Sequence, residues 1–276
     1  MIGAIVPAHN EEALLGCCLA ALTVAARHAA LAGESVRVVA VLDACTDRSE
    51  AVAWAAGVEI VTVAARNVGV ARAVGAALLL AAGARWLAFT DADSRVSPDW
   101  LAVQLSLGAE AVCGSICVDD WSAQPPSVRE IFTRVYRDVD GHRHVHGANL
   151  GVCASAYQRA GGFPPLACRE DVALVERLIA IGANIAWSAA PRVITSARAA
   201  ARVRGGFGDT LASWTTGAQP YGQSGHQPAL SNDVSSSCAR SVQDAGIGVA
   251  ACFTGSNVSD PFATGEFQIF QSERFS

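Results

Sequence analysis

Short β-rich runs alternate with helical patterns as far as Leu107, and no other feature of the sequence limits the possible folds as strongly. The predicted strands cover residues 2–7, 36–42, 58–63 and 86–90, and the predicted helices cover residues 10–32, 47–56, 68–82 and 98–107. The first helix is expected to start at Asn10, whose side chain can cap it ahead of Glu11 and Glu12. Strict alternation of strand and helix predicts a parallel sheet with right-handed crossovers.

Polar residues follow each of these four predicted strands. Ligands of an open parallel sheet bind beyond the carboxyl ends of its strands, so these residues are expected to meet at one edge. In chain order they are Pro7 to Asn10, Asp43, Arg66 with Asn67, and Asp91 with Asp93.

The pattern is mixed beyond residue 109. Strands are predicted at residues 111–118, 145–153, 185–187 and 193–195, and helices at residues 125–139, 155–160 and 170–181. Residues 215–276 contain no Trp and only two Arg, and they are rich in Gly, Ser, Gln and Asn. That composition is typical of a disordered or poorly packed tail.

Charge and hydrophobicity exclude several classes of protein. Hydrophobic residues make up 51% of the 276 residues and charged residues 16%, against ~25% charged in an average chain. The net charge of −5 disfavours a broad nucleic-acid-binding surface. All 20 basic residues are Arg, which excludes mechanisms that need a Schiff-base, Walker or kinase lysine.

The sequence indicates a cytoplasmic protein without a membrane span. The longest apolar runs, residues 13–26 and 73–84, are shorter than the ~18 to 20 residues of a spanning helix, and the N-terminus lacks a signal-peptide pattern. Peripheral contact with a membrane surface is compatible with this composition. The nine Cys are an odd number without a Cys-x-x-Cys pair, which indicates reduced core thiols rather than disulfides or a zinc site.

Two carboxylates one residue apart, Asp91 and Asp93, follow the fourth predicted strand. They could share Mg²⁺ or Mn²⁺, which prefer oxygen ligands and often bridge substrate phosphates. The alternative interpretation is a polar turn that caps the next helix. Asp43 could accept hydrogen bonds from a nucleobase, whereas Asp47 better suits the cap of the helix that follows it.

Two further groups of residues have a functional and an ordinary interpretation. Arg66, Asn67 and Arg72 lie at the start of a predicted helix, which suits a pyrophosphate but also an ordinary helix start with a surface arginine. Glu170 and Asp171 open another helix, where acids are commonplace, although a carboxylate facing a sugar acceptor could act as a general base.

Three alternating histidines, His142, His144 and His146, would share one face of a strand and could resemble a metal site. A solvated hairpin is the favoured interpretation, because no other ligand cluster pairs with them. Glycines at Gly147 and Gly161 would let the backbone approach a ligand.

Taken in order, these motifs resemble the family-2 inverting glycosyltransferases, which have the GT-A fold. The motifs are Val6–Glu12, Asp43–Asp47, Arg66–Gly69, Asp91–Asp93, His146–Asn149, Gly161–Phe163 and Glu170–Asp171. The resemblance covers residues 2–214 and implies an α/β fold with a mainly parallel mixed sheet flanked by helices. Residues 1–118 would form a Rossmann-like half that binds the nucleotide sugar, and residues 119–214 an acceptor-binding half.

The resemblance implies an enzyme that moves a sugar from a nucleoside-diphosphate sugar to an acceptor hydroxyl with inversion. It implies Asp171 as the general base, Mg²⁺ or Mn²⁺ at Asp91 and Asp93, and a saccharide, lipid or small molecule as acceptor. The residues expected at the nucleotide sugar are Pro7, Ala8, Asn10, Glu11, Asp43, Arg66, Asn67, Arg72, Asp91, Ala92 and Asp93, and those expected at the acceptor are Gly147, Asn149 and Glu170.

The chain departs from the family pattern at one point. Many relatives place a metal-ligating His in the C-terminal part, where this chain has Thr195 to Arg198. Arg198 could support the diphosphate instead, which leaves the dependence on a metal open. A non-catalytic nucleotide-sugar-binding protein is the alternative function. A nucleotidyltransferase would normally show a Gly-rich first loop and a Lys, and an NAD-dependent oxidoreductase would need Gly-x-Gly-x-x-Gly after the first strand.

Overall fold

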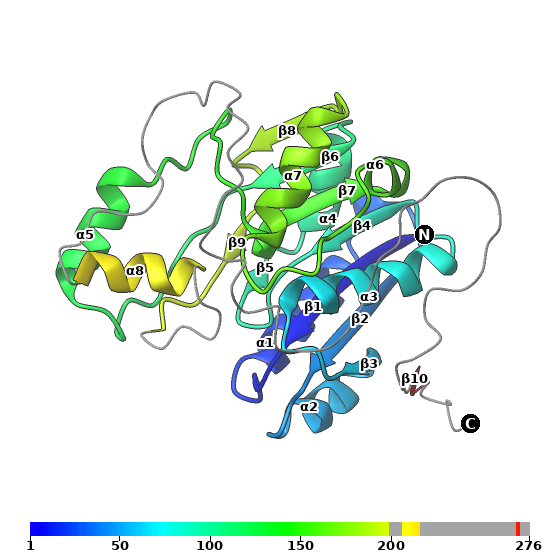
Figure 1. The fold of residues 1–276 in the computed structure, drawn as a ribbon, viewed down its shortest axis with the longest axis horizontal. Coiled ribbons are helices and arrows are strands. Elements are labelled where there is room, and N and C mark those ends of the chain that lie inside the picture. The colour runs from blue at the N-terminus through cyan, green and yellow to red at the C-terminus, as the bar shows by residue number, and fades with distance from the viewer. Residues whose placement is uncertain (199–205, 216–268, 271–276) are drawn as a thin grey trace, which may run out of the picture. The chain divides into compact units, whose positions relative to one another are not determined.

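One mixed sheet organises the chain, as the computed structural model in Figure 1 shows. The structure describes residues 1–198, 206–215 and 269–270. The strand order is β10-β3-β2-β1-β4-β7-β6-β8. These strands are β1 (Ile2–Ala8), β2 (Val36–Asp43), β3 (Glu59–Val63), β4 (Trp86–Phe89), β6 (Ala111–Gly114), β7 (Leu150–Cys153), β8 (Ile185–Ser188) and β10 (Ile269–Phe270).

The first four strands pair as the alternating pattern predicts. β1 is parallel to β2 on one side, with Ile2 opposite Val36, and parallel to β4 on the other, with Ile2 opposite Trp86. β3 continues the parallel set beside β2. The α/β class with a mainly parallel sheet is therefore confirmed. The carboxyl ends of these strands lie at one edge, where the polar residues follow them.

Helices cover both faces of this sheet. The α-helices are α1 (Leu15–Ala25), α2 (Ser49–Ala56), α3 (Val68–Ala81), α4 (Trp100–Ser106), α5 (Pro126–Val135), α6 (Ala154–Arg159), α7 (Glu170–Ala180) and α8 (Phe207–Thr215). Two short 3₁₀ turns, η1 (Ala29–Leu31) and η2 (Gly147–Asn149), connect longer elements.

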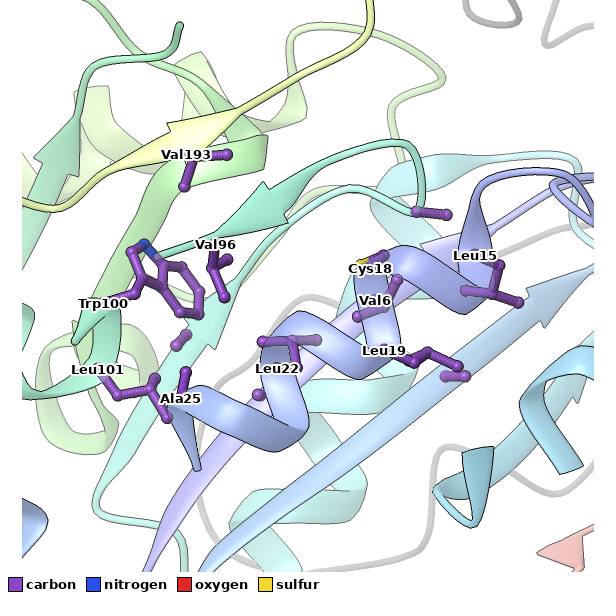
Figure 2. Packing of buried hydrophobic residues seen from close by; sticks show 14 of the residues in the cluster. Val6, Leu15, Cys18, Leu19, Leu22, Ala25, Val96, Trp100, Leu101 and Val193 are labelled. Atoms are coloured by element: carbon purple, nitrogen blue, oxygen red, sulfur yellow. The ribbon is translucent and has the colours of Figure 1, made fainter. Parts of the chain in front are cut away.

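Successive side chains of β1 enter two different cores, because neighbouring residues of a strand point to opposite faces. Ala4 and Val6 pack with α1 and α4, whereas Ile5 packs with α3 and α7. Figure 2 shows the first of these cores, in which Leu22 and Ala25 of α1 lie on the side of Trp100 and Leu101 of α4. Every residue of β1 is buried, as a central parallel strand requires.

The second half adds antiparallel pairing and a smaller cluster. β7 runs antiparallel to both β4 and β6, and β8 runs parallel to β6. A separate two-stranded sheet joins β5 (Arg95–Val96) to β9 (Val193–Ile194). α5 and α8 share a third apolar cluster that includes Val128, Leu211 and Trp214.

Several predicted boundaries differ from the structure. The predicted first helix is wrong at both ends, because α1 begins at Leu15 and ends at Ala25. Asn10 has a φ of 53°, which is the left-handed region, so it turns the chain instead of capping a helix. The predicted strand 111–118 ends at Gly114, where an added Cβ would come within 2.1 Å of Asn149 Nδ2.

Three further predictions from the sequence concern the tail, the cysteines and membrane-spanning helices. In the predicted tail, Ile269 and Phe270 pair antiparallel with β3, while residues 216–268 and 271–276 lie outside the described ranges. The thiols of Cys17, Cys18, Cys45, Cys113, Cys117 and Cys153 are not in disulfides, and Cys238 and Cys252 fall outside the described ranges. Within the described residues, no helix combines the length and apolar character needed to cross a bilayer.

We expect Leu19→Ala to lower the free energy of unfolding by about 2–5 kcal/mol, because its fully buried side chain fills the core between α1 and the sheet. The control is Val24→Ala on the same helix, whose side chain is 55% exposed and whose loss should cost less than about 0.5 kcal/mol. Urea unfolding measures both. Equal effects would contradict the packing of α1 described above.

Candidate active site

The loop after β3 is organised by a buried carboxylate at the end of β2. Asp43 Oδ1 accepts hydrogen bonds from the backbone N–H groups of Ala65 and Arg66, at 2.8 and 2.7 Å, and Oδ2 accepts one from Asn67 at 2.6 Å. Both oxygens of the side chain therefore hold the β3–α3 loop. Asp43 lies where the sequence placed it, at the strand end, and there it shapes the loop that carries Arg66.

The loop after β1 is tied to the same region. Asn10 Oδ1 accepts a hydrogen bond from the Thr46 backbone at 2.7 Å, and the Asn10 N–H points to Cys45 Sγ at 3.4 Å. The Cys45 thiol in turn donates to the Ala8 carbonyl at 3.3 Å. Pro7 and Ala8 are the last two residues of β1, and both are buried. A ligand could therefore contact them only from the carboxyl end of the strand.

The loop that carries Arg66 also meets the second half of the chain. Asn67 caps α3 by accepting from the Val70 N–H at 3.1 Å, and its amide donates to the Pro165 carbonyl at 3.1 Å. Gly69 donates to the Leu166 carbonyl at 3.2 Å, and an added Cβ there would lie 2.3 Å from the Pro164 oxygen. Arg66 itself is exposed, with a left-handed φ of 48°.

The turn after β4 holds the two carboxylates that the sequence singled out. The Asp91 carbonyl accepts from the Cys18 thiol at 3.3 Å and from the Ser94 N–H at 3.0 Å, and Ala92 is buried between the two acids. Burial raises the pKa of Asp93 to about 6, and the negative charge of Asp91 adds to the shift. The turn therefore concentrates negative charge at the edge of the sheet.

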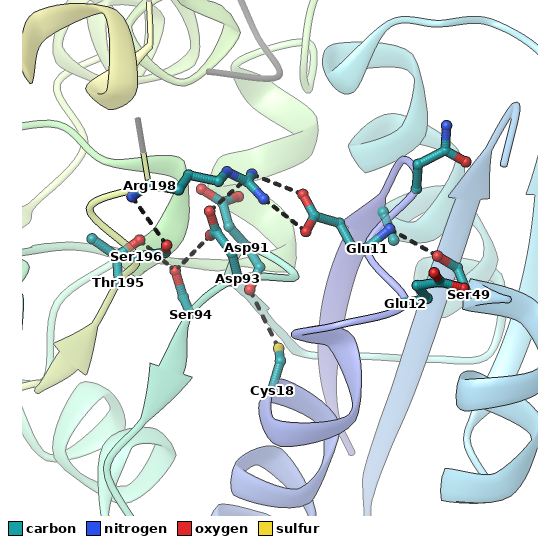
Figure 3. A network of polar contacts seen from close by, with 12 residues as sticks. Glu11, Glu12, Cys18, Ser49, Asp91, Asp93, Ser94, Thr195, Ser196 and Arg198 are labelled. Atoms are coloured by element: carbon teal, nitrogen blue, oxygen red, sulfur yellow. Dashed lines mark hydrogen bonds and ion pairs between the residues drawn. The ribbon is translucent and has the colours of Figure 1, made fainter. Parts of the chain in front are cut away.

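An arginine from beyond β9 neutralises part of this charge. Arg198 forms a two-pronged ion pair with Glu11, at 2.8 Å for each contact, and its Nη2 lies 3.0 Å from Asp93 Oδ2. Figure 3 shows the guanidinium between the two carboxylates. The sequence alone suggests Arg198 as a diphosphate contact, because no local pattern connects it to Glu11, 187 residues away.

A second arginine lies deeper in the site. Arg72 of α3 contacts Asp91 Oδ1 at 2.5 Å and forms a shorter ion pair with Glu170 in the first turn of α7. The side chains of Arg72 and Glu170 are both almost fully buried. Arg72 thus joins the β4 turn to α7, and Glu170 is directed at Arg72 rather than at the open side of the site.

The neighbouring acid has a different environment. Asp171 is only partly buried, and its Oδ2 accepts from the Gly147 backbone N–H at 2.8 Å. Gly147 also packs on Arg72, since an added Cβ would come within 2.2 Å of its guanidinium. Asp171, Gly147 and Arg72 therefore lie together, and Asp171 is the member of this group that reaches solvent.

Asn149 was expected at the acceptor, but its side chain is completely buried. Its Nδ2 donates to the Ser115 carbonyl at 2.7 Å and the Pro191 carbonyl at 2.9 Å, and its Oδ1 accepts from Trp100 Nε1 at 2.8 Å. The residue thus ties four segments together beneath the site. Both amide hydrogens of Asn149 are therefore used within the protein, and its buried side chain has no exposed surface to offer an acceptor.

The three alternating histidines pack around an aromatic ring. The Tyr136 and His144 rings stack with 4.3 Å between centroids, and the Tyr136 hydroxyl lies 2.9 Å from His146 Nε2. Burial lowers the pKa of all three imidazoles, that of His146 to about 3. The predicted solvated hairpin is wrong, because these rings lie against Tyr136 and each other in a loop.

The carboxylates fit a divalent cation only as a partial ligand set. Among the residues that the structure describes, no group of three His, Cys, Asp or Glu side chains is placed to hold a metal ion. Asp91 and Asp93 alone offer two oxygen donors. Mg²⁺ is commonly held by one or two carboxylates together with substrate phosphates and water, so this pair suits a cation that arrives with a diphosphate.

Comparison with known proteins adds independent findings. The model of the family described as "Glycosyl transferase family 2" matches residues 4–143. No curated protein sequence matches the chain. Among solved structures, TarS 1–349 of S. aureus superposes with a TM-score of 0.59 at 14% identity, covering 75% of this chain and 61% of TarS 1–349. The chain therefore spans about three fifths of that relative.

A second solved structure is similar over a larger share of its length. Glucosyl-3-phosphoglycerate synthase from Mycobacterium tuberculosis superposes with a TM-score of 0.52 at 16% identity, covering 78% of this chain and 76% of the synthase. At these identities the likeness concerns the fold. It agrees with the mixed sheet and the flanking helices described above.

We expect Arg72→Met to lower the free energy of unfolding by about 3–5 kcal/mol, because it leaves the buried Glu170 carboxylate without its counter-charge. The matched control is Arg95→Met, which breaks an ion pair with Asp119 whose side chains are 48% and 53% exposed. That change should cost less than about 1 kcal/mol. Chemical unfolding measures both variants, and a loss no larger for Arg72 than for Arg95 would contradict the buried ion-pair network.

Proposed function

Since the chain belongs to glycosyl transferase family 2, we propose that it transfers a sugar from a nucleoside-diphosphate sugar to an acceptor hydroxyl with inversion at the anomeric carbon. One observation carries the proposal. A charged array at the carboxyl ends of the parallel strands is joined through Arg72 to the first turn of α7, where an accessible carboxylate lies. Such an array would stabilise the negative charge of the leaving diphosphate and supply a base for the acceptor hydroxyl within one site.

The donor side would use the loops at the strand ends. The backbone around Pro7, Ala8 and Asn10, together with the loop that Asp43 holds, would receive the nucleoside, and Arg66 would face the diphosphate. Asp91 and Asp93 would hold Mg²⁺ or Mn²⁺, and the bound ion would neutralise charge on the leaving diphosphate. TarS was solved with UDP-GlcNAc, and the mycobacterial synthase with Mn²⁺ and UDP, so UDP-sugars are the first donors to test.

Asp171 would act as the general base. A carboxylate that takes the proton from the acceptor hydroxyl must reach the acceptor, and Asp171 is partly exposed whereas Glu170 is buried against Arg72. The hydrogen bond from the Gly147 N–H orients the Asp171 carboxylate. Attack by the acceptor on the face opposite the leaving diphosphate would invert the configuration of the sugar.

The acceptor belongs to one of three chemical classes: a saccharide, a lipid or a small molecule. A cytoplasmic location, with peripheral membrane contact in the case of a lipid, stays a prediction from the sequence.

The first experiment measures thermal shifts with UDP-, GDP- and dTDP-sugars, each with Mn²⁺ and with EDTA. Hydrolysis of the best donor without acceptor then separates an enzyme from a binding protein. A donor that stabilises the protein in the presence of Mn²⁺ and is slowly hydrolysed supports the transferase. Stabilisation without any turnover would favour the non-catalytic nucleotide-sugar-binding protein instead.

We expect Asp171→Asn to lower kcat by about 10²- to 10⁴-fold, the usual contribution of a general base. The amide nearly preserves volume and leaves the donor loops intact, so donor affinity should stay near that of the wild type. Steady-state kinetics and donor titration measure the two quantities.

The control for this substitution is its neighbour in the sequence. Glu170→Gln should reduce the stability of the protein, because Glu170 is the buried partner of Arg72. If the kinetic loss follows Glu170 and not Asp171, the general base has been assigned to the wrong residue.

A further inference from the structure

We propose that Arg198 couples the binding of a divalent cation to the binding of the nucleoside diphosphate. In the free protein its guanidinium holds Glu11 and Asp93, and the incoming diphosphate draws it away, which releases Asp93 for the cation. This inference rests on the proposed function, because it assigns the order of events within the same donor site.

The charge count of the site gives Arg198 this role. Four carboxylates, from Glu11, Asp91, Asp93 and Glu170, share only the two guanidinium groups of Arg72 and Arg198. A cation at Asp91 and Asp93 would compete with Arg198 for the same carboxylate, since Arg198 Nη2 lies 3.0 Å from Asp93 Oδ2. A cation that binds without a diphosphate must therefore displace the Arg198 guanidinium or bind beside it, where the two positive charges repel each other.

Of the two arginines, only Arg198 is free to change partners. The Arg72 side chain is 4% exposed, and Glu170 holds it from the other side. The Arg198 side chain is 27% exposed, and its guanidinium ion pairs are with the two acids that face the donor site. A guanidinium forms two-pronged contacts with phosphate as readily as with carboxylate, so a diphosphate offers it an equivalent partner.

The backbone that carries Arg198 is firmly held, so the change requires only a side-chain rearrangement. Thr195 Oγ1 lies 2.9 Å from Ser94 Oγ beside the two acids, and the Thr195 N–H donates to the Cys117 carbonyl at 2.8 Å. The Ala197 carbonyl accepts from Gln124 Nε2 at 2.9 Å. Glu11 is fixed as well, because its N–H donates to Ser49 Oγ at 2.8 Å.

Thermodynamic linkage makes the coupling reciprocal. If the diphosphate removes Arg198 from Asp93, it raises the affinity for the cation, and the cation must raise the affinity for the diphosphate by the same factor. The wild-type protein should then bind Mn²⁺ weakly alone and much more tightly with a nucleoside diphosphate.

The test titrates Mn²⁺ alone into the full chain and follows free Mn²⁺ by electron paramagnetic resonance. Arg198→Gln should tighten binding of Mn²⁺ by about tenfold, because the competing charge is gone. The matched control is Arg192→Gln, which removes the same charge from an exposed ion pair with Asp138 and should change the affinity less than about twofold. Thermal unfolding verifies that each variant is folded.

The same titration is repeated with UDP, GDP and dTDP. Arg198→Gln should lose most of the gain in Mn²⁺ affinity that the nucleotide gives to the wild type. Arg198→Lys keeps the charge but lacks the planar guanidinium. It should bind Mn²⁺ weakly without nucleotide and should show part of the gain in Mn²⁺ affinity when nucleotide is present. It serves as the second variant if Arg198→Gln does not fold.

The outcomes separate this inference from the proposed function. Unchanged Mn²⁺ affinity in Arg198→Gln, while the wild type binds a nucleoside diphosphate, overturns the coupling and leaves the transferase proposal standing. A similar rise in both Arg198→Gln and Arg192→Gln also overturns it, since a general charge effect would then suffice. A wild-type protein that binds none of the three nucleotides, with or without Mn²⁺, overturns both.

Discussion

The buried ion-pair network of Arg72 is the interaction on which the rest of the site depends. Arg72 comes from α3, Asp91 from the turn after β4, and Glu170 from the first turn of α7. The charges of Arg72 and Glu170 are removed from water and are costly unless they are paired, so their ion pair favours the arrangement that brings α3 and α7 together. That arrangement places Asp171 and Gly147 beside the strand-end acids. One buried guanidinium therefore connects the proposed donor side with the proposed base.

The two arginines of the site differ in exposure. Glu11, Asp93 and Arg198 form a second set of ion pairs, but Arg198 is partly accessible to solvent. Partly exposed ion pairs are cheaper to rearrange than buried ones, because water and a ligand can replace the lost partner. The inner set can thus keep the geometry of the site fixed while the outer set exchanges partners with a charged ligand.

Much of the fold and part of the site were predictable from the sequence. The alternation of strands and helices fixes β1 to β4 as a parallel set, and that places Asp43, Asp91 and Asp93 at one edge. The first helix was misjudged, because Asn10 adopts a left-handed turn that is stabilised by Thr46 from a distant loop. The contacts of Asn149 and of the histidines also depend on residues elsewhere in the chain. Trp100, which donates to Asn149, is 49 residues away from it, and Tyr136 is ten residues from His146.

The sequence by itself determined the elements, the parallel core and the kinds of charged residue at the strand ends, because these follow from local periodicity and from the rule that ligands bind at that edge. Only the tertiary structure decided which arginine pairs with which carboxylate. Arg72 and Glu170 are 98 residues apart, and Arg198 and Glu11 are 187 apart. No local pattern encodes such pairs. They form because packing of the helices on the sheet brings the carboxylates together at one edge, where each buried charge requires a partner of opposite sign.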